Sequence, residues 1–143
     1  MKSVPLPEVV IPHRKPFLFL TEVELVEPGE KASGFWMVSS EEAFFDGHFP
    51  GRPTLPGVIM CEAIAQLGAY ALLSRSDLSD RLPLFGGLDR ARFRRQVFPD
   101  ERLDLEVEIS RLSSRGGRGI GTASVEGSVA CVSELLFVFA QDR

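Results

Sequence analysis

The sequence predicts an α+β fold in which one long antiparallel sheet curls around a single buried helix. One helix-length segment is apolar on nearly all sides, two strand-like segments precede it, and four follow it. A helix that is apolar on every side has to be buried on every side. The chain of 143 residues suits a single domain over residues 1–143, so the cover for the helix has to be the sheet itself.

The segment before the helix predicts a hairpin and a long loop. The first dozen residues contain several prolines, so we expect them to be irregular. Residues 17–26 and 31–39 are typical of two antiparallel strands joined at the turn sequence EPGE. Residues 40–56 are dense in Gly, Pro and Phe and are too long for an ordinary connection. Loops of this kind are frequently functional.

The central helix is predicted over residues 58–74, directly after a Pro-Gly step. Only Glu62 and Gln66 interrupt its apolar surface. The apolar stretch is shorter than the roughly 20 residues that span a bilayer, so a buried core helix is expected.

The remaining chain predicts four strands that complete the sheet. The sequence VEGS is typical of a tight hairpin turn in which Gly127 adopts a positive φ. The sequence RGGR at residues 115–118 indicates a flexible corner before the next strand. We expect the strands at residues 84–97, 103–112, 119–125 and 128–140.

Composition argues against several classes of function. The net charge of −4 disfavours general affinity for nucleic acid or anionic membranes. Cys61 and Cys131 form no CxxC or CxxH pattern, so we expect two buried thiols and no metal site. The first residues resemble neither a secretory signal nor an anchor, so we expect a cytoplasmic protein without a membrane span.

Glu62 and Gln66 are four residues apart and therefore share one face of the helix. Glutamate is rarely buried unless it is paired or functional. A carboxylate at a subunit seam, or one bonded to a backbone donor, explains the residue equally well at this point. In an apolar setting burial raises the pKa of Glu62, which would let it act as an acid near neutral pH.

His48 lies in the loop sequence GHFPG, where nearby glycines and prolines fix the backbone and Phe49 and Pro50 follow directly. A stiff loop is how a general base is held in position. A lone histidine is more often structural than catalytic. The stiff loop, rather than the residue type, is therefore what makes His48 a candidate for the base. The other histidine, His13, lies beside two basic residues and far in sequence from the helix, and we interpret it as structural.

The start of the helix supplies a third element. The first N–H groups of a helix have no intrahelical partner. The N–H groups of Gly57 and Val58, with the positive end of the helix dipole, can polarise a carbonyl oxygen placed there. A base, an acid and a carbonyl-binding site are therefore expected to meet at one spot.

The stretch HFPGRPTLPGVIMCEAIAQ resembles the signature of the FabZ-type 3-hydroxyacyl-[acyl-carrier-protein] dehydratases. The resemblance continues in IPHRKPFLFLTEV, in LFGGLDRARFRRQVFPDERL and in the VEG turn before SELLFVF, so it covers nearly the whole chain. It implies a hot-dog fold that dimerises through its sheet edges and is commonly assembled further as a trimer of dimers. The related FabA type carries Asp at the position of Glu62, which favours dehydration without isomerisation here.

The resemblance also implies a role for each site residue, with the histidine of one subunit facing the glutamate of its neighbour. His48 would take a proton from C2 of a (3R)-hydroxyacyl thioester, and Glu62 would protonate the departing C3 hydroxyl. Gly57 would hold the thioester carbonyl and Gln66 would orient Glu62. The resemblance implies no metal or redox cofactor, and a substrate carried on the phosphopantetheine of acyl carrier protein.

Acyl carrier protein is acidic, so its docking surface is expected to be basic. The sequence DRARFRRQ supplies four arginines for such a surface: Arg90, Arg92, Arg94 and Arg95. On a strand the first three share one face. A solvated strand face without any docking function explains the same cluster, so both interpretations stay open.

Three positions depart from the family pattern. Arg52 stands where a small polar residue is usual, and Pro99-Asp100-Glu101 replaces a Pro-Gly-Asp turn. The Gly-rich segment at 119–124 of the predicted strand lacks the expected bulky residues, so we expect it to pack more loosely. None of these departures removes a catalytic group.

Two alternatives remain open. A hot-dog acyl thioesterase uses a carboxylate on the central helix to activate water, but it gives the HFPG loop no role. A non-catalytic acyl-binding subunit has no need of both His48 and Glu62. Acyl-chain preference depends on the end of the binding tunnel, which no local motif defines.

Overall fold

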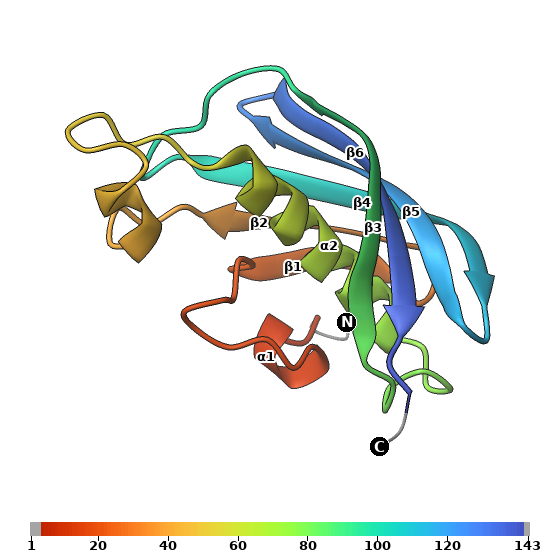
Figure 1. Ribbon diagram of the computed structural model, residues 1–143. Helices are drawn as coiled ribbons and strands as arrows, with labels where there is room; N and C mark the ends of the chain where they lie inside the picture. Colours follow the sequence, from red (N-terminus) through yellow and green to blue (C-terminus); the bar gives the residue numbers. More distant parts are fainter. Residues whose placement is uncertain (1–3, 142–143) are drawn as a thin grey trace.

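A six-stranded antiparallel sheet and one long helix dominate the computed structural model, which describes residues 4–141 (Figure 1). The strand order across the sheet is β1-β2-β4-β5-β6-β3, so β1 and β3 are its two edges. The strands are β1 (Glu22–Glu27), β2 (Lys31–Met37), β3 (Pro83–Phe93), β4 (Arg102–Ser113), β5 (Gly116–Val125) and β6 (Ser128–Phe139). The helical elements are α1 (Pro7–Val10), the 3-10 turn η1 (Ala43–Asp46) and α2 (Gly57–Leu73).

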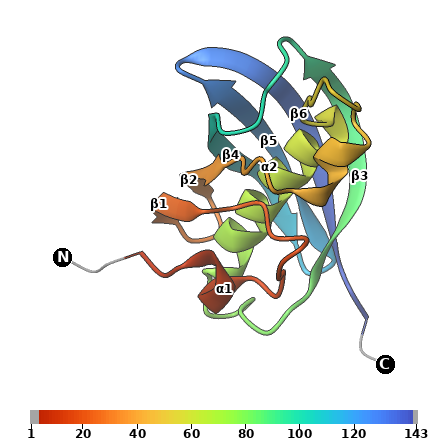
Figure 2. The same cartoon turned by 90° about the vertical axis from the view of Figure 1, so that its left-hand side faces the viewer.

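Helix α2 lies in the hollow of the curled sheet, as Figures 1 and 2 show from two directions. Every residue from Ala63 to Leu73 is buried, which an apolar helix surface requires. The helix predicted over residues 58–74 is confirmed within one residue at each end. The predicted α+β class, with one helix wrapped by six antiparallel strands, is confirmed as well.

The Gly-rich strand β5 allows the helix to approach the sheet closely. A Cβ atom on Gly121 would lie 2.2 Å from Cγ2 of Ile64, and one on Gly68 of α2 would lie 2.5 Å from the ring of Phe137. No side chain fits into either gap without displacing its neighbour. The expectation that this strand packs loosely is therefore wrong, because the missing side-chain volume is filled by the helix.

Three strand boundaries differ from the predicted ones by at least three residues, and one of them is the end of β3, which lies at Phe93 rather than at residue 97. β1 begins at Glu22 rather than at residue 17, because the backbone of Phe17 and Phe19 bonds to the side chain of Gln66 instead of a neighbouring strand. β5 begins at Gly116, so the predicted flexible corner is part of the strand. A Cβ atom on Gly116 would lie 1.9 Å from the carbonyl oxygen of Phe137, so only glycine fits this register.

The N-terminal segment is more regular than its prolines suggested. Residues Pro7–Val10 form the short helix α1, with the first-turn proline that helices favour. The guanidinium of Arg14 donates to the carbonyl oxygens of Glu8 and Ile11, both at 2.9 Å. These bonds fix the backbone next to His13.

The predicted hairpin turn between β5 and β6 is confirmed. Glu126 and Gly127 have φ values of +48° and +80°, the pattern of a two-residue turn in which both central residues are left-handed. Asp100 also has a positive φ, +70°, at the turn where the family pattern carries glycine. In the described part of the chain, no helix is long and apolar enough to cross a membrane.

Candidate active site

Gln66 is the polar centre of the contact between α2 and the segment before β1. It is fully buried, and its Oε1 accepts the N–H of Phe19 at 2.7 Å. Its Nε2 donates to the carbonyl of Phe17 at 3.0 Å and to Oε2 of Glu62 at 3.1 Å. The last bond is the contact that an orienting role for Gln66 requires.

Glu62 lies in an apolar pocket of about 340 Å³. Its side chain is 16% exposed, and small residues, Ala65 and Ala69, continue the same helix face into the pocket. Burial raises the pKa of Glu62, and the hydrogen bond from Gln66 offsets part of that increase. The direction agrees with the one predicted from the sequence, and it favours a protonated carboxyl.

His13 is the second polar residue of this pocket. Its Nε2 lies 3.8 Å from Oε2 of Glu62. The interpretation of His13 as a structural residue, based on its distance in sequence from the helix that carries Glu62, missed this contact. No local pattern signals it, because the contact forms only when the segment before β1 packs on α2 through Gln66.

His48 has a defined tautomer. Its Nδ1 lies 2.7 Å from the carbonyl oxygen of Thr54, which can only accept, so Nδ1 carries the hydrogen. Nε2 then holds the free lone pair that a general base needs. The backbone N–H of Thr54 donates back to the His48 carbonyl at 2.9 Å, and the Phe49 ring stacks on the imidazole at 4.0 Å between centroids.

The loop around His48 is closed by its own backbone. Phe49 and Arg52 exchange two hydrogen bonds, at 3.2 and 2.8 Å, and Pro50 and Gly51 form the turn between them. The N–H of Leu55 donates to the carbonyl of Val97 and attaches this loop to the loop that follows β3. This is the rigid setting that the Gly and Pro content predicted.

His48 and Glu62 have different surroundings within one chain. His48 is not among the residues that line the pocket of Glu62. Among residues 4–141, no hydrogen bond or ion pair joins the two side chains. One chain therefore carries the predicted base and the predicted acid without pairing them.

The start of α2 presents free donors. Among the hydrogen bonds of the described residues, none uses the N–H of Gly57 or of Val58. The ring of Phe93 lies against Gly57, and a Cβ atom there would approach it to 2.8 Å. Phe93 is thus a neighbour of the predicted carbonyl-binding position. The sequence did not reveal this neighbour, because the contact joins α2 to the end of β3.

These parts suit proton transfer beside a polarised carbonyl. A buried carboxyl can give a proton, a neutral imidazole with a free Nε2 can take one, and unpaired helix N–H groups can stabilise a carbonyl oxygen as charge develops on it. Among residues 4–141, no group of three His, Cys, Asp or Glu side chains could hold a metal ion. Both cysteines are buried and free, as predicted, with their sulfur atoms 3.9 Å apart.

The arginine cluster does not form one strand face. A register shift lies between Asp89 and Arg92, and Arg90 at this bulge has a φ of +50°. Arg94 follows the last residue of β3. The expectation that Arg90, Arg92 and Arg94 share a face is therefore wrong, because a bulge interrupts the alternation of side chains. All three side chains are still exposed.

Ion pairs distinguish the four arginines. Arg95 is half-buried and bonds to Glu101 at 3.2 Å, so it fixes the loop after β3. Arg90 lies 3.4 Å from Glu134 on the neighbouring strand. Arg92 and Arg94 form no ion pair with any residue in the range 4–141. These two retain the most freedom to meet an external anion.

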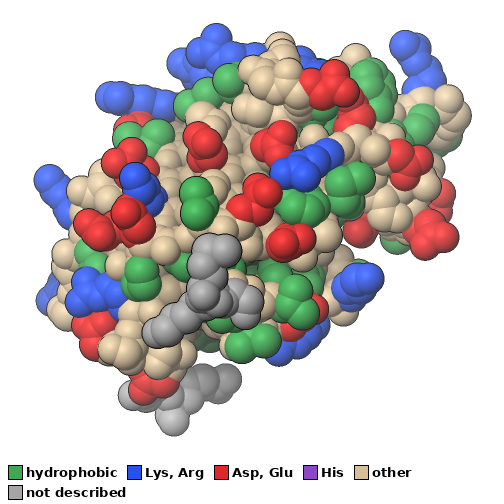
Figure 3. Space-filling model, turned by 180° about the vertical axis from the view of Figure 1, so that it is seen from behind, with side chains coloured by type: hydrophobic (Ala, Val, Ile, Leu, Met, Phe, Trp, Pro, Cys, Tyr) green, Lys and Arg blue, Asp and Glu red, His purple; other side chains and the backbone are tan. Residues whose placement is uncertain are grey.

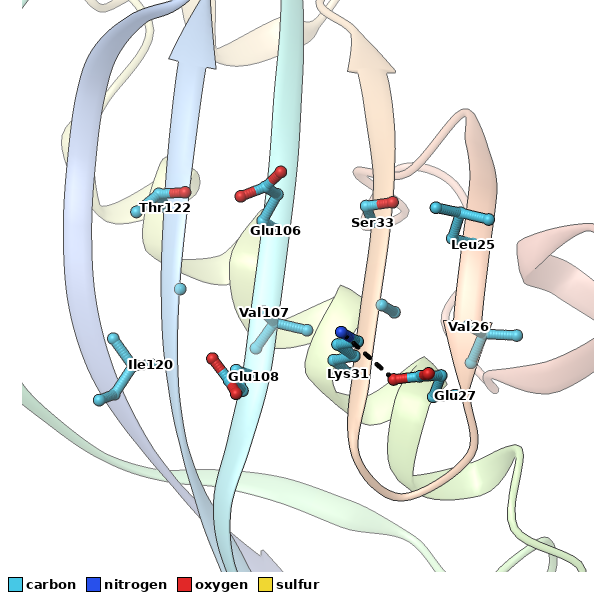
Figure 4. Close-up of a pocket in the computed structure, with 12 residues that line it drawn as sticks. Leu25, Val26, Glu27, Lys31, Ser33, Glu106, Val107, Glu108, Ile120 and Thr122 are labelled. Atoms are coloured by element: carbon cyan, nitrogen blue, oxygen red, sulfur yellow. Dashed lines mark ion pairs between the residues drawn. The ribbon is translucent and has the colours of Figure 1, made fainter.

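A separate groove of about 660 Å³ lies on the outer face of the sheet, away from α2 (Figure 4). Figure 3 shows the molecule from behind, where Asp and Glu side chains lie among apolar and basic ones. It combines exposed Leu25 and Ile120 with an ion pair between Lys31 and Glu27 at 3.4 Å. None of the predicted site residues lines it. The groups able to transfer protons beside a carbonyl therefore lie on the helix side of the sheet.

Comparison with known proteins identifies the family. Residues 11–133 match the family model described as a FabA-like domain. The chain is 51% identical over 132 residues to the 3-hydroxyacyl-[acyl-carrier-protein] dehydratase FabZ of Moorella thermoacetica, an alignment that covers 92% of each chain. It is 46% identical to the FabZ of Bacillus subtilis, covering 92% of this chain and 94% of that one.

Solved structures confirm the hot-dog fold. A chain of the dehydratase heterocomplex ApeI:P from Xenorhabdus doucetiae superimposes with a TM-score of 0.82 at 21% identity, covering 98% of this chain and 94% of that one. A hypothetical thioesterase from Streptococcus pneumoniae gives a TM-score of 0.64 at 10% identity, covering 85% and 87%. At these identities the likeness concerns the fold alone, and the sequence relatives carry the assignment. The chain belongs to the FabZ-type 3-hydroxyacyl-[acyl-carrier-protein] dehydratases.

Proposed function

We propose that this protein dehydrates (3R)-hydroxyacyl-[acyl-carrier-protein] to trans-2-enoyl-[acyl-carrier-protein] in fatty-acid biosynthesis, with His48 as base and Glu62 as acid. The observation that carries the proposal is the different setting of the two groups: the Glu62 carboxyl lies in an apolar pocket, and the His48 imidazole is held by a bond from Nδ1 to the carbonyl of Thr54. Burial raises the pKa of Glu62, while the bond to Thr54 leaves the Nε2 lone pair of the neutral imidazole free. One group is ready to give a proton and the other to take one.

The proposed reaction consists of two proton transfers, one from C2 to the base and one from the acid to the leaving hydroxyl. Nε2 of His48 takes the proton from C2, and the electron pair of that C–H bond forms the C2–C3 double bond. The bond from C3 to the hydroxyl oxygen breaks as Glu62 protonates that oxygen, and water leaves. The N–H groups of Gly57 and Val58 stabilise the negative charge that builds up on the thioester oxygen. The chemistry needs neither a metal nor a redox cofactor.

The proposed site is shared between two copies of the chain. Strand β3 is an edge of the sheet, and its residues Pro83, Leu84 and Phe85, with the preceding Leu82, also form one wall of the pocket of Glu62. A second copy paired along this edge would lie beside the pocket and could bring its own His48 to Glu62. A homodimer follows from the same proposal, and we propose its further assembly as a trimer of dimers because the family resemblance implies it.

Acyl carrier protein is the proposed partner, and Arg92 and Arg94 are its proposed contacts. Both side chains are exposed and unpaired within residues 4–141, and they follow the bulge of β3 close to Phe93. Phe93 in turn lies against the start of α2. A carrier docked there would have its phosphopantetheine arm near the carbonyl-binding N–H groups. The carrier-linked substrate and the two free thiols suit a cytoplasmic enzyme.

The reaction is tested by following enoyl absorbance with carrier-linked hydroxyacyl substrates from C4 to C16. His48→Ala and Glu62→Gln should each lower kcat by at least about a hundredfold. Unchanged turnover in either variant would contradict the assigned roles. Release of free thiol without enoyl product would identify a thioesterase instead, and binding without turnover would identify a non-catalytic subunit.

Mixing the two inactive variants tests whether the site is shared. After co-refolding, half of the dimers contain one chain of each kind, and each such dimer has one site with both His48 and Glu62 intact. About one quarter of wild-type activity should return. If both residues of a site came from one chain, no mixed dimer would contain a complete site and the mixture would stay inactive.

A further inference from the structure

His13 and Gln66 face the same oxygen of Glu62. Nε2 of Gln66 donates to Oε2 at 3.1 Å, and Nε2 of His13 lies 3.8 Å from that oxygen. We propose that His13 is a positioning residue which, with Gln66, holds Oε2 of Glu62 and leaves Oε1 to carry the proton to the substrate hydroxyl. This inference rests on the proposed role of Glu62 as the acid.

The environment of His13 indicates which ring nitrogen carries the hydrogen. Nδ1 is buried and has no hydrogen-bond partner among the described residues. Burying an N–H group without an acceptor costs more free energy than burying a nitrogen lone pair without a donor. The hydrogen therefore belongs on Nε2, the nitrogen that faces Glu62, and the imidazole acts as a donor to Oε2.

His13 keeps its neutral form because of its surroundings. Burial lowers the pKa of His13, and the adjacent Arg14 lowers it further. The pocket contributes no compensating negative group besides Glu62, since its other lining residues, from α2, β3, β6 and the segment before β1, are apolar. A neutral donor can orient a protonated carboxyl without forcing it to ionise, which a cation at the same place would do.

The separation of 3.8 Å is longer than a hydrogen bond. Hydrogen bonds of catalytic groups are often long in a ligand-free enzyme and shorten when substrate is bound. The segment that carries His13 is already held on both sides, by Arg14 on the carbonyls of Glu8 and Ile11 and by Gln66 on Phe17 and Phe19. Since the backbone around His13 is held, the proposal requires the side chains of His13 and Glu62 themselves to close the contact when substrate is bound.

Three substitutions of His13 separate positioning from simple packing. His13→Gln keeps a neutral N–H donor, His13→Leu removes the donor, and His13→Lys places a permanent cation beside Oε2. The measurements are kcat over a range of pH and the titration of Glu62 itself, by NMR of protein with ¹³C-labelled glutamate carboxyls. The signal of Glu62 is assigned by its absence in Glu62→Gln, and urea unfolding confirms that each variant is folded.

The expected pattern differs for each variant. His13→Gln should keep kcat within about threefold of wild type and leave the alkaline limb of the pH profile in place, while His13→Leu should lower kcat about tenfold. The pKa of Glu62 should rise in His13→Leu, where a donor to the ionised form is lost. It should fall by about 1 or more in His13→Lys, which moves the alkaline limb to lower pH.

The measurements distinguish a failure of the proposed function from a failure of the proposed role of His13. If wild-type protein forms no enoyl product, the proposed function is wrong whatever the His13 variants do. If wild-type protein dehydrates the substrate but His13→Leu and His13→Lys leave both kcat and the titration of Glu62 unchanged, the positioning role is overturned. A loss of activity that is equal in all three folded variants, with no shift in the titration, also overturns it and indicates packing alone.

Discussion

The amide of Gln66 lies 3.1 Å from the carboxylate of Glu62 and 2.7 Å from the N–H of Phe19, so one buried side chain connects the candidate acid to the segment that carries His13. The position of Glu62 therefore depends on a tertiary contact as well as on the helix. Stability and activity are coupled at this residue, because the same amide serves both.

Replacing Gln66 by leucine should lower both the stability and the activity of the protein. The buried N–H of Phe19 and the carbonyl of Phe17 would lose their partner, at a cost of about 2–4 kcal/mol in the free energy of unfolding. Urea denaturation measures this cost, and enoyl absorbance should show a lower kcat. Gln141→Leu is the matched control, since Gln141 is exposed and its side chain forms no hydrogen bond with another described residue, and it should change stability by less than about 0.5 kcal/mol. Equal effects of the two substitutions would contradict the structural role of Gln66.

The pH dependence of stability should reveal the buried carboxyl of Glu62. Burial raises its pKa above the ordinary value of 4.5, so the folded chain keeps a proton that the unfolded chain has lost. Below that value the carboxyl is neutral in both states, and above it the folded state loses stability as pH rises. Glu62→Gln, which stays neutral, should therefore be more stable than wild type at pH 7 and similar to it near pH 4.

Urea denaturation over this pH range checks the prediction for Glu62. Glu106→Gln, on the exposed outer face of the sheet, is the control and should show no comparable gain at pH 7. A stability difference between Glu62→Gln and wild type that does not change with pH would mean that the raised pKa is absent.

Because α2 approaches β5 closely, we expect any side chain at Gly121 to destabilise the fold. A methyl group there would meet Cγ2 of Ile64 and the backbone carbonyl of Glu106, so Gly121→Ala should cost about 1–3 kcal/mol. Gly47→Ala serves as the control, because its Cβ would enter open space and its φ of −104° suits any residue. Thermal or urea unfolding of the two variants compares them directly. If Gly121→Ala proved no worse than Gly47→Ala, the tight helix–sheet contact would be in doubt.

The sequence predicted what depends on local pattern and missed what depends on distant contacts. The limits of α2 follow from its apolar run, and the turn at Gly127 follows from its neighbours. The start of β1 could not be predicted, because Gln66, far along the chain, takes the backbone bonds of Phe17 and Phe19. The contact of His13 with Glu62 has the same origin, and the bulge at Arg90 depends on how β3 pairs with β6.

Charge reversal at the end of β3 tests carrier docking. Arg92→Glu with Arg94→Glu should raise the KM for carrier-linked substrate about tenfold and leave turnover of a small thioester analogue unchanged, because both side chains are exposed and touch no reacting group. The effect should shrink at high salt, where exposed charges are screened. The strand register places Arg111 near the opposite end of the sheet, since it pairs with Arg118 of β5, which faces Leu136 of β6, whereas Arg94 bonds to Ala130.

Arg111→Glu with Arg115→Glu is therefore a matched control, because it makes the same change in net charge at two exposed arginines far from the proposed contact. It should leave the KM for carrier-linked substrate near the wild-type value. If this control and the β3 variant raised KM equally, net charge rather than a docking site would be responsible. If neither raised it, the arginines would be a solvated surface, and the carrier would approach the start of α2 from another side.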